Sequence, residues 1–337
     1  MINSTPETTP FVSVIMPIYN AEKYLRYSLK CAVSQTLKNI EIICINDGST
    51  DDSLQIINEY AANDTRIILI NQANAGYGAA VNRGIKTATG EYIAIFEPDD
   101  WIEPEMYEVL FDTASKNNLD VVKADYYKYW SNAKDELEPI SKDNVYNQVF
   151  TPSPQVYHSN IWGSIWSALY RRDMLVHNGI DLLETPGAAF QDTGFIFKTN
   201  VCAKRMMLID KAFLHYRQDN AASSINNKDK IFYVCNEYDA IDAFLKEHRL
   251  LQWQSLADRK RCEVYLWNLE RLSAPNRRIF LERTKPFLLK ALSAAEHGEM
   301  SLSRKKMQKL LLLQKSENKL LYYYKIKDFL HKLRSLI

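Results

Sequence analysis

The sequence contains no long apolar segment, and no stretch approaches the ~18 uninterrupted apolar residues that a membrane-spanning helix requires. Its first ten residues are polar and carry no basic cluster, which argues against a signal peptide. Cysteine is scarce: the five cysteines are scattered and never form a C-x-x-C pair, a pattern that indicates neither a disulfide framework nor a zinc site. We therefore expect a cytoplasmic protein, either free or peripheral on the inner face of the cell membrane.

Net charge is also nearly absent, because 42 lysines and arginines face 41 aspartates and glutamates. The chain therefore lacks the global field on which nucleic-acid binders rely. The balance is uneven, however. Ten basic and two acidic residues lie between Arg304 and Ile337, so this segment carries a charge of +8 and the rest of the chain −7. This asymmetry predicts an acidic globular body followed by a basic tail that could bind a surface.

Short apolar runs alternate with helical patterns through the first hundred residues. Buried strands are predicted at 12–16, 40–45, 66–70 and 92–96, with amphipathic helices between them. This repetition predicts an α/β fold with a doubly wound, mostly parallel sheet. The segment 131–154 is polar and contains three prolines, which indicates a surface excursion, and nearly everything after residue 228 has a helical pattern.

Ligands of such sheets bind outside the carboxyl ends of the strands, so the residues that follow each predicted strand are of interest. Tyr19 follows the first strand and offers a ring on which a base could stack. Asp47 follows the second and could accept a hydrogen bond from a base imide, so the two together could read a pyrimidine. Ordinary turn and helix-cap chemistry is an equally good interpretation of the sequence around Asp47.

Three carboxylates, those of Glu97, Asp99 and Asp100, follow the fourth predicted strand. Their mutual repulsion favours a divalent cation, and oxygen ligands suit Mg²⁺ or Mn²⁺ bridging to a diphosphate. A solvated turn is the alternative interpretation. The nearby Gly76-x-Gly78 does not match a dinucleotide-binding fingerprint, because Val81 occupies the sixth position and the motif follows the third strand. An NAD-dependent dehydrogenase is therefore disfavoured.

Several motifs taken together resemble family 2 of the glycosyltransferases, the inverting GT-A type. They occur in the family's order over the first third of the chain, at 12–20, 46–52, 74–76, 82–85, 88–93 and 98–102. The resemblance implies a GT-A fold, Rossmann-like with helices on both faces of the sheet, and metal-assisted transfer from a UDP-sugar. Together with the helical and charge patterns described above, it predicts a nucleotide-sugar-binding half at 1–100, an acceptor-binding half at 101–227 and a helical region with a basic amphipathic tail at 228–337.

The same resemblance assigns roles to individual residues. The donor would be bound by the residues Pro17, Tyr19, Asn20, Asp47, Gly76, Asn82, Asp99 and Arg217. The metal would be held by Asp99, with Glu97 and His215 as further candidates. The chain departs from the family at two positions here, with Glu97 in place of an aspartate and Val81 in place of a frequent arginine.

The second half contains the candidate general base. Phe190 to Phe195 resembles the segment in which the family keeps its catalytic carboxylate, and Asp192 matches that aspartate, whereas Gln191 replaces a frequent glutamate. Without the resemblance, Asp192 is simply an acid at a helix N-terminus. His215 and Arg217, followed by Ser223 and Ser224, resemble the segment that closes over the diphosphate, although a half-buried strand would have the same pattern.

Two apolar patterns leave alternatives open. Trp162, Trp166 and Tyr170 could line the acceptor sugar or pack in the core. The last predicted helix has an apolar face that could lie on anionic lipid or pack on its own domain, formed by Tyr322, Ile326, Phe329, Leu330, Leu333 and Ile337.

We therefore expect a hexosyl- or N-acetylhexosaminyltransferase that modifies a free or lipid-linked glycan in the synthesis of a surface polysaccharide, such as lipopolysaccharide or capsule. The departures at Glu97, Val81 and Gln191 motivate the alternative, a non-catalytic nucleotide-sugar-binding protein with a degenerate metal site.

Overall fold

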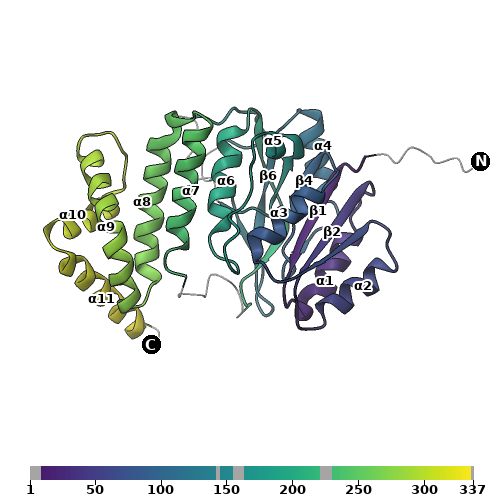
Figure 1. Ribbon diagram of the computed structural model, residues 1–337, viewed down its shortest axis with the longest axis horizontal. Coiled ribbons are helices and arrows are strands. Elements are labelled where there is room, and N and C mark those ends of the chain that lie inside the picture. Colours follow the sequence, from purple (N-terminus) through teal and green to yellow (C-terminus); the bar gives the residue numbers. More distant parts are fainter. Residues whose placement is uncertain (1–8, 142–144, 155–162, 221–229, 335–337) are drawn as a thin grey trace, which may run out of the picture. The chain divides into compact units, whose positions relative to one another are not determined.

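The computed structural model describes residues 9–141, 145–154, 163–220 and 230–334, the last four of these by their backbone only (Figure 1). Two compact units are present, Met1–Ala222 and Ser223–Ile337. Of the residues named above, Trp162, Ser223, Ser224 and Ile337 and the side chain of Leu333 lie outside the described part of the chain.

The first unit is built on four parallel strands, β1 (Val12–Ile18), β2 (Ile40–Asp47), β3 (Ile67–Gln72) and β4 (Tyr92–Ile95). β1 pairs in parallel with both β2 and β4, and β2 pairs in parallel with β3. Every residue of β1 and β2 is buried, which explains why these strands are mostly apolar in the sequence, with Ser13 and Glu41 as the interruptions before the polar end of β2. The predicted α/β sheet is confirmed.

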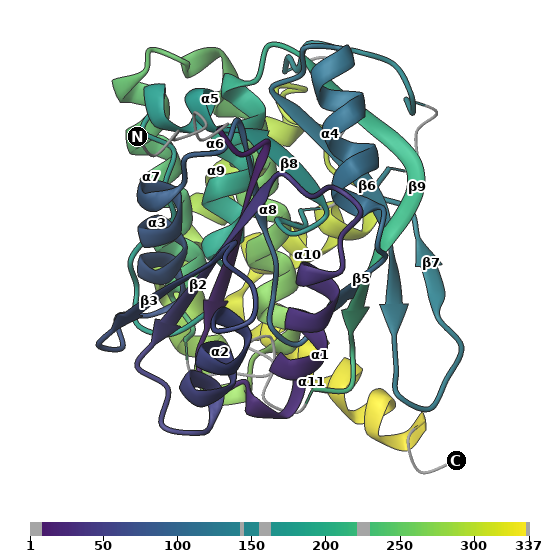
Figure 2. The ribbon, with the colours of Figure 1, turned by 90° about the vertical axis from the view of Figure 1, so that its right-hand side faces the viewer.

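Helices cover both faces of these strands. Figure 2 shows α1 (Glu22–Val33) and α2 (Ser53–Ala61) on one side and α3 (Tyr77–Thr87) on the other. Right-handed crossovers require this arrangement, because the chain moves outward from β1 to β3 and then returns to place β4 beside β1. The direction of winding therefore reverses between β1 and β4, where sheets of this kind form their ligand crevice.

The remaining strands extend the same sheet, whose order is β3-β2-β1-β4-β8-β6-β9-β5, with β7 paired to β6. β8 runs antiparallel to both of its neighbours, whereas β6 and β9 are parallel. These elements are β5 (Trp101–Ile102), α4 (Met106–Lys116), β6 (Val121–Tyr129), β7 (Glu136–Glu138), β8 (Ala168–Arg171), α5 (Arg172–His177), α6 (Gln191–Cys202) and β9 (Met206–Arg217). The excursion predicted at 131–154 thus contains a short strand, β7, that adds to the sheet.

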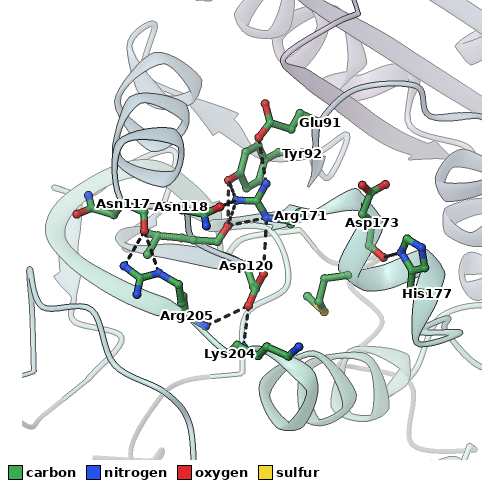
Figure 3. Close-up of polar contacts among 12 residues, drawn as sticks. Glu91, Tyr92, Asn117, Asn118, Asp120, Arg171, Asp173, His177, Lys204 and Arg205 are labelled. Carbon is green, nitrogen blue, oxygen red and sulfur yellow. Dashed lines mark hydrogen bonds and ion pairs between the residues drawn. The ribbon is translucent and has the colours of Figure 1, made fainter.

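A polar network joins β4, β8 and the end of α4 (Figure 3). Nη2 of Arg171 donates to the hydroxyl of Tyr92 at 2.6 Å and to Oδ1 of Asn118 at 2.9 Å. Asp120 accepts hydrogen bonds from two backbone amides just before β9. Tyr92 begins β4 and Glu97 follows its end, so the network stabilises the edge of the sheet opposite to the acidic residues.

The second unit is helical, as the pattern after residue 228 predicts. It consists of α7 (Tyr233–Glu247), a short 3-10 turn η2 (Leu251–Trp253), α8 (Gln254–Arg271), α9 (Ala274–Glu296), α10 (Arg304–Lys315) and α11 (Glu317–Arg334). Aromatic side chains fill its core, where Tyr265 packs edge-on against Phe280. Among the helices that the structure describes, none combines the length and the apolar character needed to cross a bilayer.

The last helix has two different faces. Leu320 and Tyr324 of α11 are fully buried, and Asp328 pairs with the buried Arg277 at 3.0 Å. A second set of apolar side chains on the same helix is between 43% and 63% exposed, namely Tyr322, Ile326, Phe329 and Leu330. The helix therefore packs on its own unit and also leaves an apolar face uncovered within that unit.

Candidate active site

The end of β2 is fixed by the carboxylate of Asp47. Oδ1 of this buried side chain accepts hydrogen bonds from Gln72 Nε2 at 2.8 Å and from the backbone amide of Ala75 at 2.9 Å, and Oδ2 accepts one from the amide of Gly76 at 2.9 Å. One residue thus ties β2 to the turn that follows β3.

The end of β1 lies at the same edge of the sheet. Pro17 is a buried residue of β1, whereas the Tyr19 side chain is 53% exposed. Oδ1 of Asn20 accepts a 2.8 Å hydrogen bond from the amide of Thr50, in the loop after β2. The structure therefore brings Tyr19 and Asn20 to the loop that Asp47 begins.

Close packing explains the glycines that precede and open α3. Gly76 has a φ of +96°, and a Cβ atom there would lie 2.6 Å from the carbonyl oxygen of Thr185. At Gly78 the corresponding distance to the carbonyl oxygen of Leu183 would be 2.1 Å. Asn82, one turn further on, both donates to and accepts from the backbone of Leu182, at 2.9 Å each. Both Gly76 and Asn82 thus hold the loop 182–187 against α3.

The loop 182–187 leads into α6, which carries Asp192 in its first turn. The buried amide of Gln191 fixes this junction. Nε2 donates to Thr185 Oγ1 at 2.8 Å and to the carbonyl of Gly187 at 3.0 Å, and Oε1 accepts from the amide of Ala189. A glutamate would lack the two donors, so glutamine has a structural reason at this position.

Four carboxylates share one neighbourhood, and we refer to Glu97, Asp99, Asp100 and Asp192 as the acidic cluster. Burial is the main reason why the pKa of Glu97 is raised to about 8; the hydrogen bond from Tyr77 opposes this rise, and the charges of Asp99 and Asp192 contribute to it. The pKa of Tyr216 is raised to about 12, mainly by burial and in addition by the negative charges of all four members of the acidic cluster. The structure thus brings Asp192 to the acidic loop after β4, about a hundred residues away in sequence.

Asp192 is desolvated, although charged and polar groups lie near it. Burial raises the pKa of its carboxyl group, while hydrogen bonds from Thr193 and the charge of Lys123 oppose the rise. Lys123 is only 3% exposed, and its ammonium donates to the carbonyl of Ser164. Sequence reasoning missed Lys123, although a lysine between Val122 and Ala124 in an apolar strand is the signal that could have found it.

Arg217 organises the acidic loop. Its Nε donates to the carbonyl of Asp99 at 2.8 Å, its backbone amide donates to Asp100 Oδ1 at 2.8 Å, and its guanidinium lies over the rings of Tyr24 and Tyr129. The other oxygen of Asp100, Oδ2, is buried and has no hydrogen-bond donor among the described residues. Burial first, and then the charge of Asp99, raises the pKa of Asp100 well above its usual range.

The predicted metal ligands are not all brought together. Within the described ranges, no three side chains of the types His, Cys, Asp and Glu are grouped closely enough to hold a metal ion. The buried ring of His215 contacts Glu103 through Nε2 at 3.1 Å and Asp135 through Nδ1. Oδ2 of Asp99 accepts a 2.8 Å hydrogen bond from Asn220. His215 is thus engaged by carboxylates other than Glu97 and Asp99.

The aromatic residues considered for the acceptor pack in the core where the structure describes them. Trp166 and Tyr170 are buried, and Trp166 stacks on Tyr216 while Tyr170 meets Phe195 edge-on. An acceptor subsite must therefore be sought elsewhere.

Comparisons with known proteins point the same way as the motifs. The family model for glycosyl transferase family 2 matches residues 13–175. EpsH of Bacillus subtilis, described as a glycosyltransferase, is 33% identical over 254 residues, which is 72% of each chain. The cholesterol galactosyltransferase of Borreliella burgdorferi is 32% identical over 227 residues, covering 64% of this chain and 63% of that one. The S. aureus TarS 1–349 structure with UDP-GlcNAc is 18% identical with a TM-score of 0.58, covers 89% and 90% of the two chains, and shows a likeness of fold.

Proposed function

The chain belongs to glycosyltransferase family 2, and we propose that it transfers a hexosyl or N-acetylhexosaminyl group from a UDP-sugar to a glycan, with inversion at the anomeric carbon. The UDP-GlcNAc bound to TarS supports a UDP-linked donor. The galactosyltransferase from Borreliella burgdorferi supports a hexosyl group. The similarity to bacterial glycosyltransferases such as EpsH supports a role in surface polysaccharide synthesis, for example of lipopolysaccharide or capsule.

The observation that carries this proposal is the acidic cluster, in which the charges of Asp99 and Asp192 both contribute to the raised pKa of Glu97. A carboxylate with a raised pKa is a better proton acceptor near neutral pH than an ordinary aspartate. We assign Asp192 as the general base. It takes the proton of the acceptor hydroxyl while that oxygen forms its bond to the anomeric carbon, and the bond from this carbon to the diphosphate oxygen breaks on the opposite face.

The donor's nucleoside fits the edge formed by β1 and β2. The exposed ring of Tyr19 offers a stacking surface. From the part of the chain that the structure describes, Oδ2 of Asp47 accepts a single hydrogen bond, donated by Gly76. Each carboxylate oxygen has two lone pairs, so Oδ2 can also accept a hydrogen bond from a uracil imide. Pro17 and Asn20 would shape this edge. Gly76 and Asn82 would contribute to donor binding indirectly, by holding the loop 182–187 in place.

A divalent cation, Mg²⁺ or Mn²⁺, fits the acidic loop. Oδ2 of Asp100 is a buried oxygen without a donor among the described residues, and it lies in the field of Asp99 and Glu97. Oxygen donors of this kind suit hard divalent cations, and Asp99 with Asp100 or Glu97 would hold the ion. The ion would supply positive charge that stabilises the diphosphate leaving group.

His215 could join this set of metal ligands only by releasing Glu103 or Asp135. Arg217 already donates a hydrogen bond to the backbone carbonyl of Asp99, so we propose that it contributes to diphosphate binding indirectly, by positioning the loop that carries Asp99.

The exposed apolar face of α11 supports a peripheral association with the inner face of the cell membrane. Its apolar side chains lie in a segment with a charge of +8, and such a combination binds anionic lipid through both apolar and electrostatic contributions. This location would suit a lipid-linked acceptor.

The decisive experiment is a screen of UDP-sugars for donor hydrolysis with Mn²⁺ or Mg²⁺, repeated with EDTA. Metal-dependent release of UDP would support the proposal, and so would transfer to a glycan extract. Donor binding without turnover on any acceptor would instead favour the non-catalytic binder and would overturn it.

A further inference from the structure

A surface hollow of about 460 Å³ lies between the turn that follows β6 and the segment that follows β9. Its lining consists of Trp130, Asn132, Ala133, Lys134, Glu136 and Asp219, and we call it the Trp130 hollow. Its volume falls within the range of about 300–1,000 Å³ that is typical of small-molecule sites. The proposed donor and catalytic groups use none of its lining residues.

The chemistry of the Trp130 hollow suits an uncharged, hydroxyl-rich ring. A half-buried indole offers a flat apolar surface, and amide and carboxylate groups around it can pair with hydroxyl groups. Among the described residues that line it, Lys134 is basic and Glu136 and Asp219 are acidic, a balance that disfavours phosphate and nucleotide ligands.

The walls of the hollow are fixed to the acidic loop. Asp219 accepts a 2.7 Å hydrogen bond from the amide of Ser131 and a 3.3 Å hydrogen bond from Nη1 of Arg217. The guanidinium of Arg217 in turn holds the carbonyl of Asp99, and the next residue, Asn220, donates to the carboxylate of Asp99. A ligand in the hollow would therefore lie beside the loop that carries Asp99.

The turn that forms the other wall is also anchored. Asp135 pairs with Nδ1 of the buried His215 in β9, and Lys128 pairs with Glu138 across the β6–β7 hairpin. These contacts hold the turn at both ends, so the ring of Trp130 is presented from a positioned hairpin.

We propose that the Trp130 hollow is an acceptor subsite that binds one sugar ring of the glycan against the indole of Trp130. The inference rests on the proposed glycosyltransferase reaction. In it, Trp130 takes the role in acceptor binding that the sequence suggested for Trp166 and Tyr170, which are buried. Asp219 and Glu136 accept hydrogen bonds from the ring's hydroxyl groups, and the indole covers its apolar face.

The test uses the full-length protein and methyl glycosides of glucose, galactose, N-acetylglucosamine and N-acetylgalactosamine as probes, with binding followed by saturation-transfer NMR. At least one glycoside should bind the wild type at millimolar concentration. Trp130→Ala should raise its Kd at least tenfold, whereas Trp130→Phe and the control Trp267→Ala, at an exposed tryptophan of α8, should change it less than threefold.

Donor hydrolysis without acceptor separates this inference from the proposed function. Trp130→Ala should hydrolyse the UDP-sugar within twofold of the wild-type rate. If the wild type neither hydrolyses a donor nor transfers its sugar to a glycan extract, the proposed function fails while glycoside binding still decides the hollow. The inference is overturned if no glycoside binds, if Trp130→Ala binds as tightly as the wild type, or if Trp130→Ala loses donor hydrolysis.

Discussion

The hydroxyl of Tyr77 donates a 2.6 Å hydrogen bond to Oε1 of Glu97. This bond joins the first residue of α3 to the loop that follows β4. This contact gives a physical reason for the glutamate at position 97. The family's aspartate has one methylene group fewer and would extend less far toward the Tyr77 hydroxyl. The departure is thus coupled to a tyrosine of the glycine-rich turn.

Tyr77→Phe should therefore destabilise the fold by about 1–3 kcal/mol, because Glu97 would keep its surroundings but lose its hydrogen-bond donor. Urea denaturation followed by circular dichroism measures the change. Tyr323→Phe, at an exposed tyrosine of α11, is the matched control and should leave the free energy of unfolding within about 0.5 kcal/mol of the wild type. Equal effects of the two substitutions would contradict the coupling.

Gln191→Glu restores the family's frequent residue but should be harmful here. It removes both N–H donors to Thr185 and Gly187 and places a buried carboxylate beside a carbonyl oxygen. We expect a loss of at least about 2 kcal/mol of stability and a lower kcat, since Asp192 is the next residue. Gln308→Glu, at an exposed position of α10, should be neutral in both assays. A stable and fully active Gln191→Glu would show that the glutamine does not position α6.

Asp192→Asn should lower kcat for transfer by about 10²–10⁴ while leaving donor binding nearly unchanged, because asparagine keeps the shape but cannot accept a proton. Asp99→Asn should instead weaken metal-dependent donor binding. Asp173→Asn, at an exposed acid of α5, is the control for both. Circular dichroism and thermal melting establish that each variant folds. Retention of full activity by Asp192→Asn would remove it as the base.

The buried amine of Lys123 predicts a pH dependence of stability. Burial lowers the pKa of Lys123 from 10.5 to about 7, against the opposing charge of Asp192. Between these two values the unfolded chain binds a proton that the folded chain lacks. The free energy of unfolding should therefore rise with pH in this window, by at most about 1.4 kcal/mol per pH unit.

Lys123→Met removes this group, so its stability relative to the wild type should be highest near pH 6 and should decline toward pH 9. Urea denaturation at pH 6, 7.5 and 9 measures the trend. Lys116→Met, at an exposed lysine of α4, should differ from the wild type by the same amount at each pH. The expectation fails if the difference for Lys123→Met is also independent of pH.

The exposed face of α11 can be tested without unfolding the second unit. A truncation before α10 would remove the buried Leu320 and Tyr324, so point substitutions are preferable. Phe329→Ser combined with Leu330→Ser should reduce sedimentation with vesicles of anionic phospholipid at least fivefold, and binding by the wild type should weaken as salt is raised. Leu251→Ser, at an exposed leucine outside α11, is the control. Equal sedimentation of all three proteins would refute the membrane association.

The sequence by itself determined the parallel core of the sheet, because strands buried on both faces are mostly apolar rather than alternating, as β1 and β2 are. It also determined that Asp47 and Asp99 lie at or just beyond the carboxyl ends of strands, since parallel winding brings those ends to one edge. Both inferences depend only on local pattern and on connection rules, and the alternation of strands and helices displays these directly.

Only the tertiary structure decided which distant groups meet. Asn82 and the glycines of α3 hold the loop 182–187, and that contact delivers Asp192 to Glu97. The burial of Lys123 near α6 and the position of Trp130 near Arg217 also depend on contacts between residues that are far apart in the sequence. Such contacts join residues dozens to about a hundred positions apart, and they form because side chains of particular shape and polarity fit together in space, a property that has no period along the chain.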